Sequence, residues 1–143
     1  MQQPSYFMGL ELGSTRIKAV LTDSVFRPVA SGDFTWDSHM EGGIWTYSLD
    51  EVWYGVRTAV SSLLNIAEAQ GICASNICSI GISAMMHGYL AFDRFNHLLV
   101  PFRTWRNTVT GPAAEELSEL FGFNIPQRWS IAHLHQALRN GES

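Results

Sequence analysis

The hydrophobic pattern of the chain changes its period at Ser48, and this change constrains the fold more than any other feature. Over residues 16–23, the side chains alternate between two sets, as expected for a strand with two unlike faces. One set is Ile17, Ala19 and Leu21, and the other is Lys18, Val20 and Thr22. From Leu49 to Ala67, apolar residues recur every three or four positions, which places them on one side of a long helix. A compact apolar run then follows at residues 77–83, as expected for a buried strand. The order of these patterns predicts an α/β domain.

Turn and capping residues divide the chain into the remaining expected elements. The long helix begins at a capping box formed by Ser48 and Glu51 and ends near Gly71. Because this helix precedes it, the strand at 77–83 is expected to be parallel to its neighbours. Two shorter helices follow, one with Pro112 early and Gly122 after its end, and one capped by Ser130 and stopped at Gly141. Strands are expected at residues 6–12, 16–23 and 29–36, a loop at Gly42–Gly43, and a second hairpin at 89–92 and 97–100.

The charge balance and the apolar runs exclude two large classes of protein. The formal net charge of −4 has the wrong sign for a protein that binds phosphate backbones, so nucleic acid is not an expected partner. The apolar stretch 77–92 is broken by serine, histidine and glycine before it reaches the roughly 18 residues of a membrane helix, so no membrane is expected either. Charged residues make up only 15% of the chain against about 25% in typical soluble domains, which suggests surfaces that another part of a protein covers.

Cysteine and histidine usage gives no metal site. Cys73 and Cys78 are too far apart for a C-x-x-C motif and are interpreted as buried or idle thiols. His133 and His135 point in different directions on a helix and are interpreted as surface residues. With two cysteines and no signal-peptide pattern at the amino terminus, a cytoplasmic protein is expected.

The segment from Gly9 to Lys18 is the most informative for chemistry. A Gly13-Ser14-Thr15 turn between two strands offers backbone N–H groups and hydroxyls in a concave arrangement that suits a phosphate oxygen. Glu11, near the end of the first strand, could hold a hydrated Mg²⁺ against such phosphates. The spacing matches neither the Walker A motif nor the dinucleotide-binding fingerprint, and an ordinary hairpin turn is the alternative interpretation.

Two further segments carry candidate ligand-binding residues. Gly81-Ile82-Ser83 begins like a hydrolase nucleophile elbow but has Met85 where that motif requires glycine, so a hydrolase is not expected. Met86 and His87 follow at the carboxyl end of the same strand, where open α/β sheets place ligand contacts; a histidine bonded to the backbone is the alternative. Trp105, Arg106 and Asn107 combine an apolar face, a cation and an amide, a set suited to a sugar; a tryptophan packed under a loop is the alternative.

Three segments together resemble a known family. GLELGSTRIKAVLTD, GISAMMHGYLAFD and PFRTWRNT follow the order and spacing of the amino-terminal domain of the FGGY carbohydrate kinases, a branch of the actin-like, ribonuclease-H-like ATPases. The resemblance covers nearly the whole chain, and the Met-His-Gly turn is most similar to that of the xylulokinase-type members. It implies a mixed sheet with flanking helices, in which residues 1–143 form the amino-terminal part of the first domain and the second, nucleotide-side domain is absent.

The resemblance also implies roles for individual residues. An ATP-dependent transfer of phosphate to a hydroxyl of a ketose or polyol is expected, with ATP and Mg²⁺ as cofactors. Gly13, Ser14, Thr15 and Lys18 would contact the phosphates, Glu11 the metal, and Met86, His87, Trp105, Arg106 and Asn107 the sugar. Glu11 and Asn107 each stand where the family usually has aspartate, and Val109 stands where it usually has arginine, so the chain resembles a divergent member.

The resemblance places important parts of such an enzyme beyond this chain. The general base, the second phosphate loop and the adenosine pocket would follow Ser143, so no catalytic residue is expected within the chain and its partner would be the carboxy-terminal part of the same kinase. Alone, the chain is expected to be inactive. A non-catalytic sugar-binding or regulatory domain that keeps the fold is the alternative function, and whether the chain forms a homodimer is left open.

Overall fold

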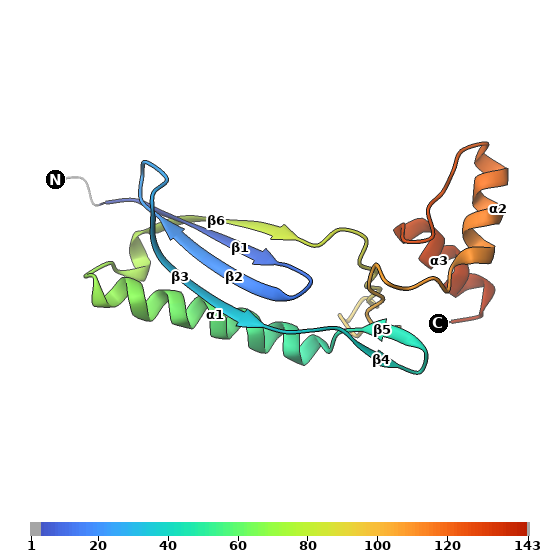
Figure 1. The fold of residues 1–143 in the computed structure, drawn as a ribbon, viewed down its shortest axis with the longest axis horizontal. Coiled ribbons are helices and arrows are strands. Elements are labelled where there is room, and N and C mark those ends of the chain that lie inside the picture. The colour runs from blue at the N-terminus through green and yellow to red at the C-terminus, as the bar shows by residue number, and fades with distance from the viewer. Residues whose placement is uncertain (1–3, 143) are drawn as a thin grey trace. The chain divides into compact units, whose positions relative to one another are not determined.

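The computed structural model describes residues 4–142, which form two compact units. The first unit contains residues 4–37 and 49–85, and the second contains residues 38–48 and 86–142 (Figure 1). Residues 1–3, where the segment compared with signal peptides begins, and Ser143 lie outside the described range. The assignment of residues 1–143 to part of one kinase domain stays a prediction.

A four-stranded mixed sheet forms the first unit. Its order is β3-β2-β1-β6, in which β1 pairs antiparallel with β2, β2 antiparallel with β3, and β6 parallel with β1. A helix and a short 3₁₀ turn directly precede β6 and allow it to cross over and lie parallel to β1. The predicted α/β class and mixed sheet are therefore confirmed. The elements are β1 (Tyr6–Leu12), β2 (Arg16–Thr22), β3 (Pro28–Thr35), α1 (Leu49–Ala69), η1 (Ala74–Asn76) and β6 (Ile77–Ala84).

The core of the first unit lies between α1 and strands β2 and β3. Alternate residues of β2 (Ile17, Ala19 and Leu21) are fully buried, as the alternation in the sequence predicted. Gly32 of β3 lets the helix backbone approach, since a Cβ atom there would lie 2.2 Å from the Ala59 carbonyl oxygen. Helix α1 therefore packs directly against the backbone of β3 at Gly32, where there is no room for a side chain.

Strand β6 is exposed, so the prediction of a buried strand at 77–83 is wrong. Ile77 is half-buried and the seven residues after it are exposed. The reason is its position: β6 is the last strand of the sheet, and α1 packs against β3 and β2 instead. Of the two interpretations of Cys73 and Cys78, buried or idle thiols, burial is wrong: both are exposed, Cys78 on β6 and Cys73 just before η1.

The second unit opens with a small hairpin where the sequence predicted only a loop. Strands β4 (His39–Glu41) and β5 (Ile44–Thr46) pair antiparallel. Gly42 and Gly43 form the connection with φ angles of 56° and 83°, the left-handed conformation that a tight two-residue hairpin turn requires at both positions. Strands of three residues are too short for alternation to be visible in the sequence.

Two helices and irregular loops complete the second unit. Helices α2 (Gly111–Phe121) and α3 (Ser130–Arg139) pack through Ala114, Leu117, Ile125 and Ala132. Gly122 ends α2 in the left-handed conformation, as predicted, whereas the cap of α3 is Trp129 and Ser130 is the first helical residue.

Two other expectations for the second unit are met only in part or not at all. The hairpin expected at 89–92 and 97–100 forms only around an antiparallel bridge between Phe92 and Leu98. Asp93 closes its turn by accepting from the backbone N–H groups of Phe95 and His97. His133, expected on the surface, is fully buried because α3 turns this side chain toward Tyr89.

Candidate functional sites

The turn between β1 and β2 is held by three hydrogen bonds. The Gly13 N–H donates to the Arg16 carbonyl at 3.0 Å, and the Gly13 carbonyl accepts from Trp36 Nε1 at 2.8 Å. The Trp36 N–H in turn donates to the Thr15 carbonyl at 3.1 Å. Both backbone groups of Gly13 are therefore engaged within the protein, and any phosphate contact at this turn falls to Ser14 and Thr15, of which Thr15 is exposed.

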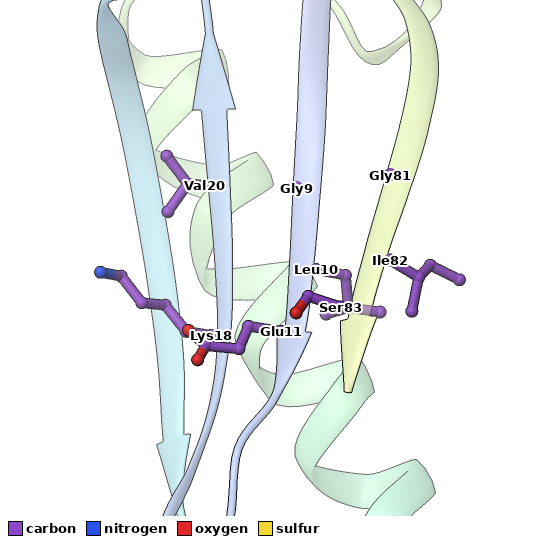
Figure 2. Close-up of a pocket in the computed structure, with 8 residues that line it drawn as sticks. All are labelled: Gly9, Leu10, Glu11, Lys18, Val20, Gly81, Ile82 and Ser83. Carbon is purple, nitrogen blue, oxygen red and sulfur yellow. The ribbon is translucent and has the colours of Figure 1, made fainter. Parts of the chain in front are cut away.

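A shallow hollow of about 360 Å³ lies on the sheet beside this turn. Glu11 stands in register with Lys18 of β2 on one side and Ser83 of β6 on the other (Figure 2). A Cβ atom at Gly9 or Gly81 would meet nothing within 4 Å, so missing side chains create the hollow. It is lined by Gly9, Leu10, Glu11, Lys18, Val20, Gly81, Ile82 and Ser83. A carboxylate, an ammonium group and a hydroxyl are thus aligned across three strands.

The donor set around Glu11 fits a hydrated metal ion and not a protein cage. Within residues 4–142, no three His, Cys, Asp or Glu side chains gather closely enough to enclose a metal. Mg²⁺ usually keeps several waters and takes only one or two carboxylates from a protein. The exposed carboxylate of Glu11 meets that smaller requirement, and Ser83 and Lys18 beside it could contact bound water or a phosphate.

In the second unit, an isolated backbone bridge joins the two segments that carry predicted sugar-binding residues. The Tyr89 N–H donates to the Arg103 carbonyl at 2.9 Å, and the Arg103 N–H donates to the Tyr89 carbonyl at 3.0 Å. His87 comes two positions before Tyr89, and Trp105 comes two positions after Arg103. Each of them lies in a turn that leaves the same end of this antiparallel bridge.

The side chains at this end of the bridge are accessible. Met86 is 73% exposed and Trp105 is 46% exposed. A tryptophan hidden under a loop is therefore not what the structure shows. His87 has a φ of 67°, a conformation that non-glycine residues rarely adopt and that is enriched at functional sites.

Asn107 and Arg106 make their contacts within the protein. Asn107 is 4% exposed, and its Oδ1 accepts from the Trp45 N–H at 2.8 Å. Its Nδ2 donates to the carbonyls of Trp45 at 2.8 Å and Thr104 at 3.0 Å. The Arg106 guanidinium lies 5.1 Å from the ring centre of Trp45 and 5.8 Å from that of Trp105. Sequence reasoning missed Trp45, because no local pattern connects it with a segment 60 residues away.

Beneath the bridge, a buried aromatic and basic cluster supports α3. The rings of Tyr89 and His133 stack with centres 5.3 Å apart. The Arg103 side chain faces Tyr89 and pairs with Glu142. Burial first, and the charge of Arg103 second, lower the pKa of His133 to about 4. The imidazole is therefore neutral at pH 7, and neither ring nitrogen has a hydrogen-bond partner within the described residues.

Comparisons with known proteins match these features to one family. The family model described as "FGGY family of carbohydrate kinases, N-terminal domain" matches residues 6–132. A xylulose kinase of Bacillus subtilis is 24% identical over 120 residues, which cover 84% of this chain and 24% of that protein. A glycerol kinase of Brucella ovis is 26% identical over 118 residues, covering 78% of this chain and 22% of that protein. The chain therefore spans about a quarter of the length of these relatives.

Solved structures show the same likeness in the fold. A structure described as a xyloylose kinase from Brucella ovis superposes with a TM-score of 0.81 at 25% identity, covering 95% of this chain and 30% of that one. A xylulose kinase from Rhodospirillum rubrum superposes with a TM-score of 0.77 at 20% identity, covering 94% and 29%. No helix within residues 4–142 is long and apolar enough to cross a membrane.

Proposed function

The chain belongs to the FGGY family of carbohydrate kinases, and we propose that it supplies the acceptor contacts and part of the phosphate contacts of a kinase that transfers phosphate from ATP to a hydroxyl of a ketose or polyol. The observation that carries this proposal is the family match over residues 6–132, which includes both the β1–β2 turn and the bridge. Relatives named for a ketose and for a polyol support the acceptor class.

On the phosphate side, residues of the β1–β2 turn and of the hollow act by charge and hydrogen bonding. Ser14 and Thr15 donate to phosphate oxygens, since the N–H of Gly13 is already used in the turn. Lys18 adds a positive charge, and Glu11 is the residue that would hold a hydrated Mg²⁺ through its carboxylate. When bound, the metal ion would neutralise charge on the phosphates.

On the acceptor side, the bridge presents a polar and an apolar group together. His87 hydrogen-bonds to a hydroxyl of the acceptor through a ring nitrogen of its imidazole. Trp105 covers the apolar face of the carbon chain, and Met86 adds a flexible apolar contact. Together they orient the hydroxyl and leave proton removal to a base that the chain does not supply.

Because the acceptor contacts lie in this chain and the general base lies in another part of the kinase, the isolated chain is inactive. Phosphoryl transfer depends on positioning and charge stabilisation around the transferred group. We place the general base, the second phosphate loop and the adenosine pocket in a carboxy-terminal part of the kinase, which is the partner of this chain. Relatives four times as long as the matched segment support that assignment.

Nuclear magnetic resonance of the ¹⁵N-labelled chain tests the two binding roles separately. D-xylulose or glycerol should shift the signals of His87 and Trp105, and MgATP should shift those of Ser14 and Thr15. Neither mixture should yield sugar-dependent ADP. Shifts of His87 and Trp105 by MgATP, with no response to either sugar, would contradict the proposal, and ADP release at kinase-like turnover would contradict the inactivity.

Glu11→Gln tests the metal role without an activity measurement. The substitution keeps the shape of the side chain and removes its charge, so Mg²⁺-dependent shifts at the turn should weaken at least several-fold. Asp33→Asn on β3 is the matched control, since Asp33 pairs in register with Lys18 and lies outside the hollow. Equal losses in both variants would assign the effect to general surface charge.

A further inference from the structure

We propose that Trp45 is a second aromatic surface of the acceptor site and that Arg106 is a positioning residue that holds the rings of Trp45 and Trp105 in place. The inference rests on the proposed function, because it names further parts of the same site. It differs from the expectation drawn from the sequence, in which Arg106 and Asn107 contact the sugar themselves.

The backbone of Trp45 is tied directly to the segment that carries Trp105. Asn107 closes a two-way contact with it, accepting from the Trp45 N–H and donating to the Trp45 carbonyl, each at 2.8 Å. The Thr104 N–H donates to the same carbonyl at 3.1 Å. Because Asn107 is almost fully buried, water cannot compete for these bonds. The end of β5 therefore has a fixed place beside residues 104–107.

The side chain of Arg106 joins the two indole rings. Its guanidinium carbon lies 5.1 Å from the ring centre of Trp45 and 5.8 Å from that of Trp105, within the range of cation–π attraction for both. Its Nη1 donates to Ser38 Oγ at 2.9 Å, which fixes the planar group from the side of β4. Contact of one guanidinium with both rings restricts the rotamers of the two tryptophans.

The resulting surface suits a small polyhydroxylated molecule. Trp105 is 46% exposed and Trp45 is half-buried, so each ring keeps accessible area after its contact with Arg106. Such rings pack against the C–H groups of a sugar, while its hydroxyls need a hydrogen-bonding group such as His87. The rings of Trp45 and Trp105, both held by the Arg106 guanidinium, would determine the width of the space in which the acceptor binds.

The indole N–H groups of the chain provide the test. The five tryptophans each give one indole signal, which Trp→Phe variants assign. Titration with D-xylulose and with glycerol should shift the Trp45 and Trp105 signals. The signal of Trp53, 59% exposed on α1 in the first unit, should stay in place.

Substitutions then separate positioning from folding. Arg106→Met keeps the length of the side chain but removes the cation, and should weaken the sugar Kd about tenfold while sugar still shifts His87. Arg106→Lys should restore part of the loss, because it keeps the charge without the planar group. Trp45→Phe should retain binding within about threefold, and Trp45→Ala should weaken it about tenfold. Urea unfolding of each variant shows whether it folds. If Arg106→Met does not fold, the comparison of sugar binding by Trp45→Phe and Trp45→Ala tests the inference in its place.

The outcomes distinguish this inference from the function on which it rests. Sugar shifts at Trp105 and His87 without a shift at Trp45, or an unchanged Kd in folded Arg106→Met, would overturn the inference and leave the proposed function standing. The absence of any response to sugar at His87, Trp45 and Trp105 would overturn both. Shifts at all three residues that weaken in Arg106→Met would support both.

Discussion

Replacement of the buried His133 by phenylalanine should make the protein less sensitive to acid. His133 is fully buried against Tyr89, and its pKa is lowered to about 4 from an ordinary value of 6.5. The unfolded chain therefore takes up a proton at a higher pH than the folded protein does. The stability that depends on a neutral His133 is complete above pH 6.5 and is lost as the pH falls towards 4.

The structure sets the size of this effect. The pKa difference between 6.5 and about 4 corresponds to about 3 kcal/mol of unfolding free energy. Arg103, which faces the same cluster, adds charge repulsion once the imidazole is protonated. His133→Phe keeps an aromatic ring for the stack on Tyr89 and removes two ring nitrogens that lack partners. We therefore expect the variant to be more stable by about 1 kcal/mol at pH 7.

Urea unfolding of both proteins between pH 7 and pH 4.5 measures this effect. The difference in unfolding free energy should widen by about 2–3 kcal/mol as the pH falls, because all other titrating groups are shared and cancel. A ¹H titration of the His133 ring should give a pKa near 4 in the folded protein. A difference that stays constant over this range, or a ring pKa above 6, would refute the account of His133 as a neutral buried group.

Two further substitutions test the packing described above. Gly32→Ala would place a Cβ atom 2.2 Å from the Ala59 carbonyl oxygen, so we expect a loss of about 3 kcal/mol in urea unfolding; Gly9→Ala, with open space around it, should change stability by less than about 1 kcal/mol. Asn107→Ala removes the amide that bonds to both backbone groups of Trp45 and should cost about 2–3 kcal/mol, and a loss below about 0.5 kcal/mol would mean that these bonds do not stabilise the unit.

The sequence was sufficient for those elements whose patterns are local. Alternation in β2 and the apolar stripe of α1 depend on neighbours within a few residues, and both elements form close to the expected bounds. The end of α2 at Gly122 follows from the left-handed conformation that glycine adopts easily. The turn at Gly13 leaves little room for a side chain, since a Cβ atom there would lie 2.9 Å from the Arg16 carbonyl oxygen. The family resemblance then gave the mixed sheet, in which β6 is parallel to β1.

Features that depend on distant parts of the chain could not be predicted in this way. An apolar strand is buried only where another element covers it, and nothing within residues 77–84 reveals that α1 packs elsewhere. His133 is buried by Tyr89, which lies 44 positions earlier in the chain. The side-chain amide of Asn107 could hydrogen-bond to a sugar, yet it hydrogen-bonds to the backbone of Trp45. In each case a tertiary contact decides the role of the residue.

The uncovered edge of β6 also determines how this chain behaves at high concentration. Its outer row of backbone N–H and carbonyl groups has no strand beside it within residues 4–142, and residues 77–84 contain neither a charge nor a proline to discourage pairing. Ile80 and Ile82 are 57% and 72% exposed on this strand. A neutral, apolar edge of this kind is a template for strand addition, so we expect the isolated chain to self-associate through β6 as its concentration rises.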